Sequence, residues 1–488
     1  MVYYKVSMVG RQPDISLARF IFTGMVAGGV QYGWALQLSL LTPYVHTLGI
    51  PHSLASIMWL FGPISGFVVG PTIGLWSDRC KSSLGRRRPF ILAGCLVICL
   101  SVLGSVVNEY STYFGPQWKA AIIFVVGFCI LDISNNVVQG PARAMMADLS
   151  GKHGCRAGNI IYAFWMAAGN ILGYSSGASA NWHKWLPVLV TNSCCEACAN
   201  LKGAFLVAVV FLVFCLMVTL ICAKEVPLSE LYEEVSYGNS GLLSIIKAFK
   251  ELPAGMPQVF VLTSLSWLAW FPFLLYNTDW VGREIYHGDL NGTKAEIDSY
   301  NKGVQIGAFG LLLNSVIHGI SSVLLEPMCS KFSSRIVWVI GNFTLFVAMV
   351  AVAVLSVIST NAYTSGSITS AVSGPDGIKI GALAIFAALG FPLAILYSIP
   401  FATVAQLATN AGGTNQGLCI GALNISIVIP QVIIGLGAGP WNALFGKGNI
   451  PAFAFAAALS LLSGLAVIAI FPKLSSNLFK SISFGSMH

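Results

Sequence analysis

The segment GLWSDRCKSSLGRRRPF, residues 74–90, places six charged side chains between two long apolar runs. Its distinctive residues are an acid–base pair, a glycine and three consecutive arginines: Asp78, Arg79, Gly85, Arg86, Arg87 and Arg88. Only 9% of the 488 residues are charged, so such a cluster marks a place where the chain leaves an apolar environment. The runs on either side therefore decide the fold class.

The composition indicates an integral membrane protein. Hydrophobic residues make up 56% of the chain, and the mean hydropathy is +0.77. A typical soluble domain has about 25% charged residues, far more than the 9% found here. The apolar runs reach about 20 residues, the length a helix needs to cross the bilayer. They lack the alternation of apolar and polar residues found in barrel strands, so the runs are predicted to be helices.

Twelve membrane-spanning helices are predicted. They cover approximately residues 20–44, 54–76, 89–108, 120–147, 157–178, 203–223, 258–277, 303–325, 335–358, 379–400, 415–438 and 450–471. The first run is too long for the core of a signal peptide, so it counts as a span. With both termini cytoplasmic, 17 Lys and Arg residues lie inside and 8 outside, as the positive-inside rule requires. The net charge of +8 thus reports topology and not nucleic-acid binding.

A charged segment near the middle divides the chain. Residues 224–257 separate six spans (1–223) from six more (258–488). Two six-span halves joined by a cytoplasmic linker are the plan of major facilitator transporters. A basic cluster like that in 74–90 can simply keep a loop on the cytoplasmic side of the membrane. The Gly-x3-Asp-Arg spacing instead favours a loop that ties the cytoplasmic ends of neighbouring helices together. The prediction is an all-α membrane protein with the major facilitator fold.

The fourth predicted span carries a polar stripe. Asp132, Asn136, Gln139 and Arg143 follow the i, i+4, i+7, i+11 spacing of one helix face. The two charges are about 16 Å apart along the axis and cannot pair directly. Amides can serve as contacts between helices, but a charge in the bilayer costs about 2.5–3.5 kcal/mol and normally faces a cavity or a partner. Because burial favours the uncharged form of a carboxyl, Asp132 is a candidate proton carrier.

Other polar residues suggest a sugar site and a gate. In the first span, Gln31, Trp34 and Gln37 combine amides with an aromatic ring, the mixture that a sugar requires, although a tryptophan at the membrane interface is an alternative. At the end of the seventh span, Asp279 and Arg283 are spaced to pair, and Glu284 follows. These three residues form either a solvated helix end or an external gate.

The cysteines and the loops give less information about function. Six of the twelve cysteines lie within the predicted spans, while Cys194, Cys195 and Cys198 share an outer loop where a disulfide is possible. Asn291 begins a glycosylation sequon. No second cysteine pair with zinc spacing accompanies these three cysteines and no phosphate-binding loop is present, so neither a metal site nor an enzyme is predicted.

Taken together, the motifs resemble the plant sucrose–proton symporters, a branch of the major facilitator superfamily. The resemblance runs from about residue 20 to 472 and rests on GVQYGWALQLSLLTPYV, GRRRPFI, QGPARAMMADLSG, NWHKW, TDWVGREIYHG, GLLLNSV, LAILYSIPFA, NISIVIPQVI and GAGPWNALFGKGNIPAF. The short N-terminus and central loop resemble the plasma-membrane branch of cereals, with a vacuolar membrane less favoured. The partners implied by the resemblance are sucrose and other glucosides, the lipid bilayer, and protons as the coupling ion; no other cofactor is expected.

The resemblance also implies roles for individual residues. Asp132 corresponds to the proton-coupling aspartate of the family, and Arg143 to its essential arginine, either a modulator of Asp132 or a sugar anchor. Asp279, Arg283 and Glu284 match a charged cluster of the family, and His52 matches a histidine of sugar access. Asp279 is also a candidate for substrate binding, as are Asn136 and Gln139 of the polar stripe. The family often has an acid where this chain has Asn277. The rival hypotheses are an uncoupled glycoside facilitator, which needs no buried acid, and a non-transporting sensor, which favours a large extra domain.

Overall fold

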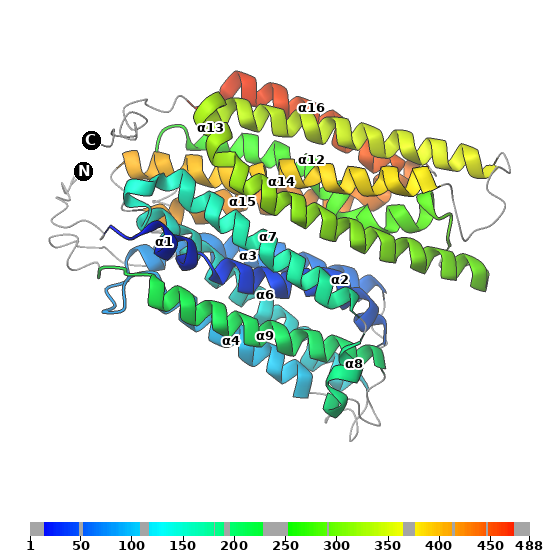
Figure 1. The fold of residues 1–488 in the computed structure, drawn as a ribbon, viewed down its shortest axis with the longest axis horizontal. Coiled ribbons are helices and arrows are strands. Elements are labelled where there is room, and N and C mark those ends of the chain that lie inside the picture. Colours follow the sequence, from blue (N-terminus) through cyan, green and yellow to red (C-terminus); the bar gives the residue numbers. More distant parts are fainter. Residues whose placement is uncertain are drawn as a thin grey trace, which may run out of the picture.

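The structure is a computed structural model that describes residues 14–47, 52–107, 117–179, 181–189, 196–227, 252–289, 292–364, 376–411, 415–445 and 448–472. Within these ranges it consists of helices and their connections, and a helix occupies every one of the twelve predicted spans. The long helices run side by side along the longest axis (Figure 1). The prediction of an all-α membrane protein is confirmed.

The first group of helices, here called the N-terminal bundle, occupies the lower half of Figure 1. Its elements are α1 (Leu17–Thr23), α2 (Val26–Thr47), α3 (His52–Asp78), α4 (Arg88–Val107), α6 (Gln117–Asp148), η1 (Gly151–His153), α7 (Gly154–Ala178), α8 (Trp182–Trp185), η2 (Pro187–Leu189) and α9 (Glu196–Cys222). The first predicted span is divided between α1 and α2 at Gly24 and Met25. In the inner loop, Gly85 has a φ of 102°, a conformation that glycine adopts without strain.

The second group, the C-terminal bundle, occupies the upper half of the same view. It contains α12 (Met256–Trp280), η3 (Val281–Ile285), α13 (Lys294–Thr364), α14 (Asp376–Asn410), α15 (Gln416–Phe445) and α16 (Ile450–Ile470). Element α13 holds two predicted spans and doubles back on itself (Figure 1). The expected loop between them is helical except at Ser333, whose φ of 73° and ψ of 151° break the helix. One residue in a left-handed conformation thus replaces a loop.

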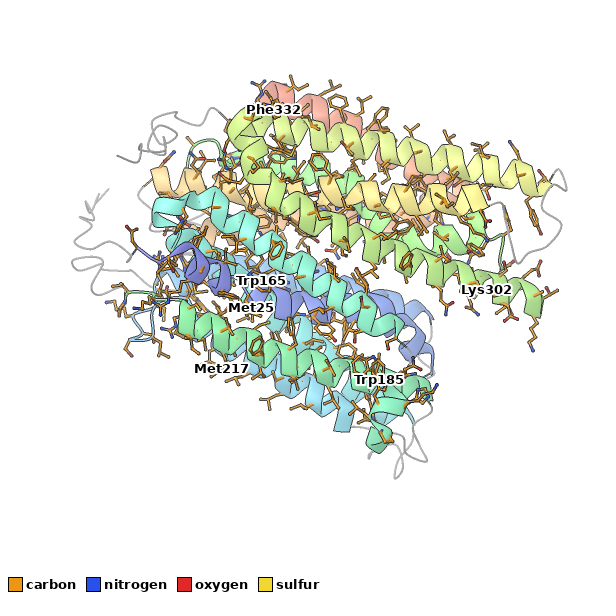
Figure 2. All side chains as sticks on the ribbon, viewed as in Figure 1. Met25, Trp165, Trp185, Met217, Lys302 and Phe332 are labelled. Carbon is orange, nitrogen blue, oxygen red and sulfur yellow. The ribbon has the colours of Figure 1, made fainter. Side chains whose placement is uncertain are left out.

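The outer surface of the helices is apolar. Met217 on α9, Phe332 on α13 and Trp185 on α8 are 54%, 44% and 60% exposed and project from the helices (Figure 2). Within the described residues, six helices are long and apolar enough to cross a membrane: α9, α12, α13, α14, α15 and α16. Exposed apolar side chains on such helices are what a lipid-facing surface requires.

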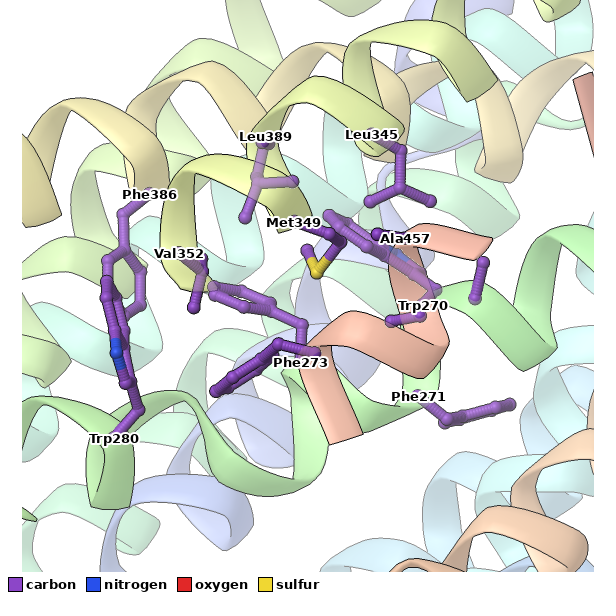
Figure 3. Close-up of a cluster of buried hydrophobic side chains, with 14 of the residues drawn as sticks. Trp270, Phe271, Phe273, Trp280, Leu345, Met349, Val352, Phe386, Leu389 and Ala457 are labelled. Carbon is purple, nitrogen blue, oxygen red and sulfur yellow. The ribbon is translucent and has the colours of Figure 1, made fainter. Parts of the chain in front are cut away.

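Each bundle has its own core, and several pairs of helices join the bundles. In the C-terminal bundle, aromatic side chains from α12 pack against α13, α14 and α16, with Trp270, Phe273 and Trp280 at the centre (Figure 3). Between the bundles, α3 packs along α15 and α7 packs along α13. Glycines permit the first of these contacts, because a Cβ at Gly74 or Gly421 would collide with backbone of the facing helix. The polar stripe of α6 therefore lies on a helix flanked by this junction.

Candidate functional site

Asp132, on the polar stripe of α6, is buried in the N-terminal bundle. Its side chain is 6% exposed and faces α3, where a Cβ built on Gly62 would come within 3.0 Å of its Oδ2. Among the described residues no cation forms an ion pair with this carboxylate. A buried acid without a paired cation is the arrangement in which a proton is most readily held.

Asn136 and Gln139 continue the stripe and differ in their surroundings. The Nδ2 of Asn136 donates to the hydroxyl of Ser65 on α3 at 3.1 Å and to the carbonyl of Asp132 at 3.0 Å. Asn136 therefore does serve as a contact between helices, which is the structural alternative raised by the sequence. Gln139 is half-buried one turn further along the same face.

Arg143 lies near the Asp148 end of α6 and joins the two bundles. Its guanidinium donates to the carbonyl of Tyr397 on α14 at 2.9 Å and to the sulfur of Met166 on α7 at 3.2 Å. It also lies 3.7 Å from the ring centroid of Phe401 and 4.2 Å from that of Tyr162. The cation is thus held by aromatic faces and a backbone carbonyl, and not by Asp132.

The polar residues of α2 lie in two different places. Gln31 donates to Oδ1 of Asn170 on α7 at 3.0 Å, and Trp34 is half-buried. Gln37 is 2% exposed and borders a cavity of about 20 Å³ inside the N-terminal bundle, which Asn135 also lines. Its Nε2 has no hydrogen-bond partner among the described residues. A cavity of this size holds one water, which could bridge the two amides.

The inner loop is organised around Arg87, which is fully buried. Its guanidinium pairs with Asp78, with Asp148 at 3.0 Å and with the hydroxyl of Ser77 at 2.6 Å. Burial lowers the pKa of Arg87, but the carboxylates of Asp78, Asp148 and Glu225 outweigh it, so that the pKa is raised overall. Arg87 therefore stays charged at the inner ends of α3, α6 and α9.

The neighbouring arginines and the start of the linker complete this inner network. Arg86 pairs with Asp148 at 2.6 Å, and Arg88 donates to the carbonyl of Leu220 at 2.8 Å, while Arg79 is half-buried. Glu225 accepts the backbone N–H of Arg87 at 3.0 Å. Burial and then the charge of Asp148 raise the pKa of Glu225, against the lowering effect of Arg87. The loop thus ties helix ends together, as its motif suggested.

The same network reaches the other bundle. The carboxylate of Asp78 accepts the backbone N–H groups of Gly417 at 3.0 Å and Leu418 at 2.8 Å. These amides form the first turn of α15, where unpaired N–H groups and the helix dipole attract an anion. Nearby, Arg156 of α7 pairs with Glu326 of α13 at 2.6 Å. We call the Asp78 contact the primary latch and the Arg156–Glu326 pair the secondary latch.

A second polar cluster lies at the other end of the C-terminal bundle. Asp279 accepts from Arg283 at 2.9 Å, from the hydroxyl of Tyr300 at 2.8 Å and from Nδ2 of Asn449 at 2.8 Å. The Oε1 of Glu284 accepts the N–H of Asn449 at 2.5 Å. The π-helical turn η3 carries both Arg283 and Glu284, and π-turns frequently occur at functional sites. This cluster ties α12 to α13 and α16.

Some predicted residues cannot be placed. The backbone of His52 begins α3, but its side chain lies outside the described residues, as do the side chain of Cys198 and all of Cys194, Cys195 and Asn291. Asn277 is 7% exposed and donates to the carbonyl of Leu274 at 2.9 Å.

Several members of these networks were not among the predicted residues: Asp148, Glu225, Tyr300, Glu326, Tyr397 and Asn449. The acids lie singly at the ends of spans, which could have marked them in so apolar a chain. The partner that contacts Arg143 on α14 is a backbone carbonyl and carries no signal in the sequence.

The fold and these sites define a transporter of the major facilitator class. Residues 22–179 match the family model described as MFS/sugar transport protein. A solved structure of the MFS proton:xylose symporter XylE, bound to 6-bromo-6-deoxy-D-glucose, is similar with a TM-score of 0.60 and 14% identity, covering 93% of this chain and 95% of that one. At this identity the likeness establishes the fold.

The particular family follows from sequence relatives. The chain is 57% identical to the sucrose transport protein SUT1 of Oryza sativa subsp. japonica, over 97% of this chain and 91% of the relative. It is 55% identical to SUT3 of the same subspecies, over 98% and 96%. The chain belongs to the sucrose transport protein family. Its members are transport proteins, so the chain is a multi-pass membrane transporter and not an enzyme.

Proposed function

We propose that this protein is a proton-coupled symporter that imports sucrose, and related glucosides, across the plasma membrane. The names of its rice relatives support the substrate, and the proton:xylose symporter with the same fold supports the coupling ion. Both termini lie in the cytoplasm in this proposal. The bundles formed by residues 1–223 and 258–488 rock against each other around a binding site that lies between them, which gives alternating access.

One observation carries the proposal of coupling. Asp132 is buried against α3 with no ion-pair partner among the described residues, so its carboxyl is suited to take up and release a proton. An uncoupled facilitator needs no such acid. One proton that crosses 100 mV supplies about 2.3 kcal/mol, enough for roughly fifty-fold accumulation of sugar.

Arg143 has a different role in this proposal. Its contacts with Tyr397 and Phe401 hold the two bundles together, and these contacts must break when the bundles separate. The released guanidinium becomes available to sugar hydroxyls or to a charged Asp132. The cluster of Asp279, Arg283 and Glu284 acts as an outer gate, with the inner latches at the opposite end.

The test is the inward current that sucrose evokes at several external pH values, in wild type and Asp132→Asn. The proposal predicts a current that grows as the pH falls and that Asp132→Asn abolishes. The matched control is Asp298→Asn, which neutralises an exposed acid on α13 and leaves the current intact. Sucrose uptake without current in the wild type would instead establish a facilitator, and an unchanged coupled current in Asp132→Asn would remove the role given to Asp132.

A further inference from the structure

Tyr397 of α14 is flanked by two buried heterocycles whose nitrogens have no hydrogen-bond partner among the described residues. The ring of His318, on α13, lies 5.6 Å from the Tyr397 ring, centroid to centroid, at an interplanar angle of 31°. The ring of Trp267, on α12, lies 5.6 Å away on a T-shaped contact at 61°. His318 is 0% and Trp267 3% exposed. Neither Nδ1 nor Nε2 of His318, nor Nε1 of Trp267, has a hydrogen bond to the described residues.

Most other rings of the same types in the described residues are bonded, although Nε1 of the buried Trp270 is also without a partner there. The indole nitrogens of Trp165, Trp280 and Trp338 donate to Ile21, Ser356 and Ser266 at 2.8, 2.7 and 3.3 Å. His153 bonds to the carbonyl of Ile15 at 2.9 Å, and His287 to the hydroxyl of Ser359 at 2.9 Å. More than 90% of buried polar groups in proteins are satisfied, and an unsatisfied one is costly. Three such nitrogens gather around Tyr397 without a partner among the described residues, which favours a bound molecule as their partner.

These nitrogens lie where the two bundles meet. The carbonyl of Tyr397 accepts from Arg143 of the N-terminal bundle. The residue next to His318, Gly319, faces Ala167 of α7, whose Cβ is 3.5 Å from the Cβ position built on the glycine. Separation of the bundles would remove Arg143 and α7 from this region and open it to the pathway. The partner would then come from the contents of the pathway.

The chemistry of the cluster fits a sugar. An imidazole ring offers one donor and one acceptor nitrogen, which matches a hydroxyl group that both accepts and donates. The indole adds a second donor, and Tyr397 adds an aromatic face for the apolar C–H side of a sugar ring. The candidate residues in the sequence came almost entirely from the N-terminal bundle, so this cluster would form the facing wall.

We propose that His318 and Trp267 bind the transported sugar from the C-terminal bundle, with hydrogen bonds from their ring nitrogens to sugar hydroxyls when the bundles part. This inference rests on the proposed sucrose transport and adds two residues that determine its specificity. Arg143 closes over Tyr397 in the state seen here and withdraws when sugar binds between the bundles.

The experiment compares uptake of radiolabelled sucrose by wild type, His318→Phe, His318→Gln and Trp267→Phe. Loss of one or two hydrogen bonds predicts a KM about tenfold higher for His318→Phe, and several-fold higher for Trp267→Phe, with maximal uptake and its stimulation by acid retained. Glutamine also offers a donor and an acceptor, so His318→Gln should recover part of the affinity. His153→Phe is the matched control, because that ring stacks on Phe20 at the inner end of the N-terminal bundle.

A series of monodeoxy sucroses then identifies the contact. Wild type should bind weakly the analogue that lacks the hydroxyl contacted by His318. His318→Phe should take up this analogue and sucrose with equal KM, and should still discriminate against the other analogues. The inference is overturned if His318→Phe and Trp267→Phe keep the wild-type KM, or if all analogues weaken equally without rescue by glutamine, as loss of a structural water would produce. A wild type that takes up no sucrose overturns both this inference and the proposed function.

Discussion

The primary latch gives the most quantitative prediction. Asp78→Asn removes a charge with little change of size, so it leaves no cavity between α3 and α15. A carboxylate at a partly buried helix N-terminus contributes up to about 2 kcal/mol, and Asp78 accepts two amides there. Arg87 retains Asp148 and the start of the linker as partners, which limits the damage to the N-terminal bundle. We expect the inner ends of the bundles to separate roughly 30-fold more often.

A native cysteine reports this opening. Cys419 follows the latched turn of α15 and is 1% exposed, so a maleimide reaches it only when the inner ends separate. Labelling of the protein in nanodiscs, read peptide by peptide by mass spectrometry, should be roughly 30-fold faster in Asp78→Asn. Cys95 is fully buried within the N-terminal bundle and serves as the internal control.

Two results would refute the reasoning. Labelling of Cys419 at the wild-type rate would show that the helix N-terminus of α15 contributes nothing to closure. An equal increase at Cys95 would show that the substitution unfolds the N-terminal bundle instead of releasing the latch.

Three further predictions use the same molecule. Gly74→Ala would drive a Cβ into the backbone of α15, and such overpacking costs about 1–3 kcal/mol. It should therefore also speed the labelling of Cys419. Gly437→Ala is the control and should not change the rate, because a Cβ at that position of α15 meets open space. Glu326→Gln should raise the same rate by no more than about fivefold, because its pair with Arg156 is partly exposed and such pairs contribute about 0.2–1 kcal/mol. Burial lowers the pKa of His287, so wild type should lose thermal stability as the pH falls through and below about 6.5, since the folded protein resists the proton that the unfolded chain accepts. His287→Gln should flatten this dependence in melting curves between about pH 5 and 7.5, and an identical pH profile in the two proteins would exclude His287 as its source.

Local patterns in the sequence were sufficient for the spans and for contacts within one helix. The length of each apolar run predicted the twelve spans, and the i, i+4 spacing of Asp279 and Arg283 predicted an ion pair that the structure contains. Membrane helices are predictable in this way because every backbone group in lipid must be bonded within its own segment. Two expectations were altered: the first span is divided at Gly24 and Met25, and the loop expected between the spans of α13 is replaced by a break at Ser333.

Contacts between distant segments had no such signature. Asp78 was predicted to tie helix ends together, but its acceptor role toward Gly417 spans 339 residues and involves backbone amides that any residue would supply. The environment of His318 was equally hidden, since a histidine in a span reads the same whether its nitrogens are bonded or free. Such features depend on which helices pack together, and this becomes visible only in three dimensions.

The geometry of α6 also constrains how a proton and a sugar could be coupled. Asp132 and Arg143 are separated by about 16 Å along one helix, so an arginine that directly neutralises the acid would have to leave Tyr397 and reach it through the space between the bundles. In the state seen here Phe401 and Tyr397 hold the guanidinium. Coupling in this arrangement must therefore pass through the closure of the bundles. Phe401→Ala removes a contact of Arg143 on α14 and should then change the pH dependence of transport, although Phe401 itself cannot titrate. An unaltered pH profile would argue for a direct link between Asp132 and Arg143.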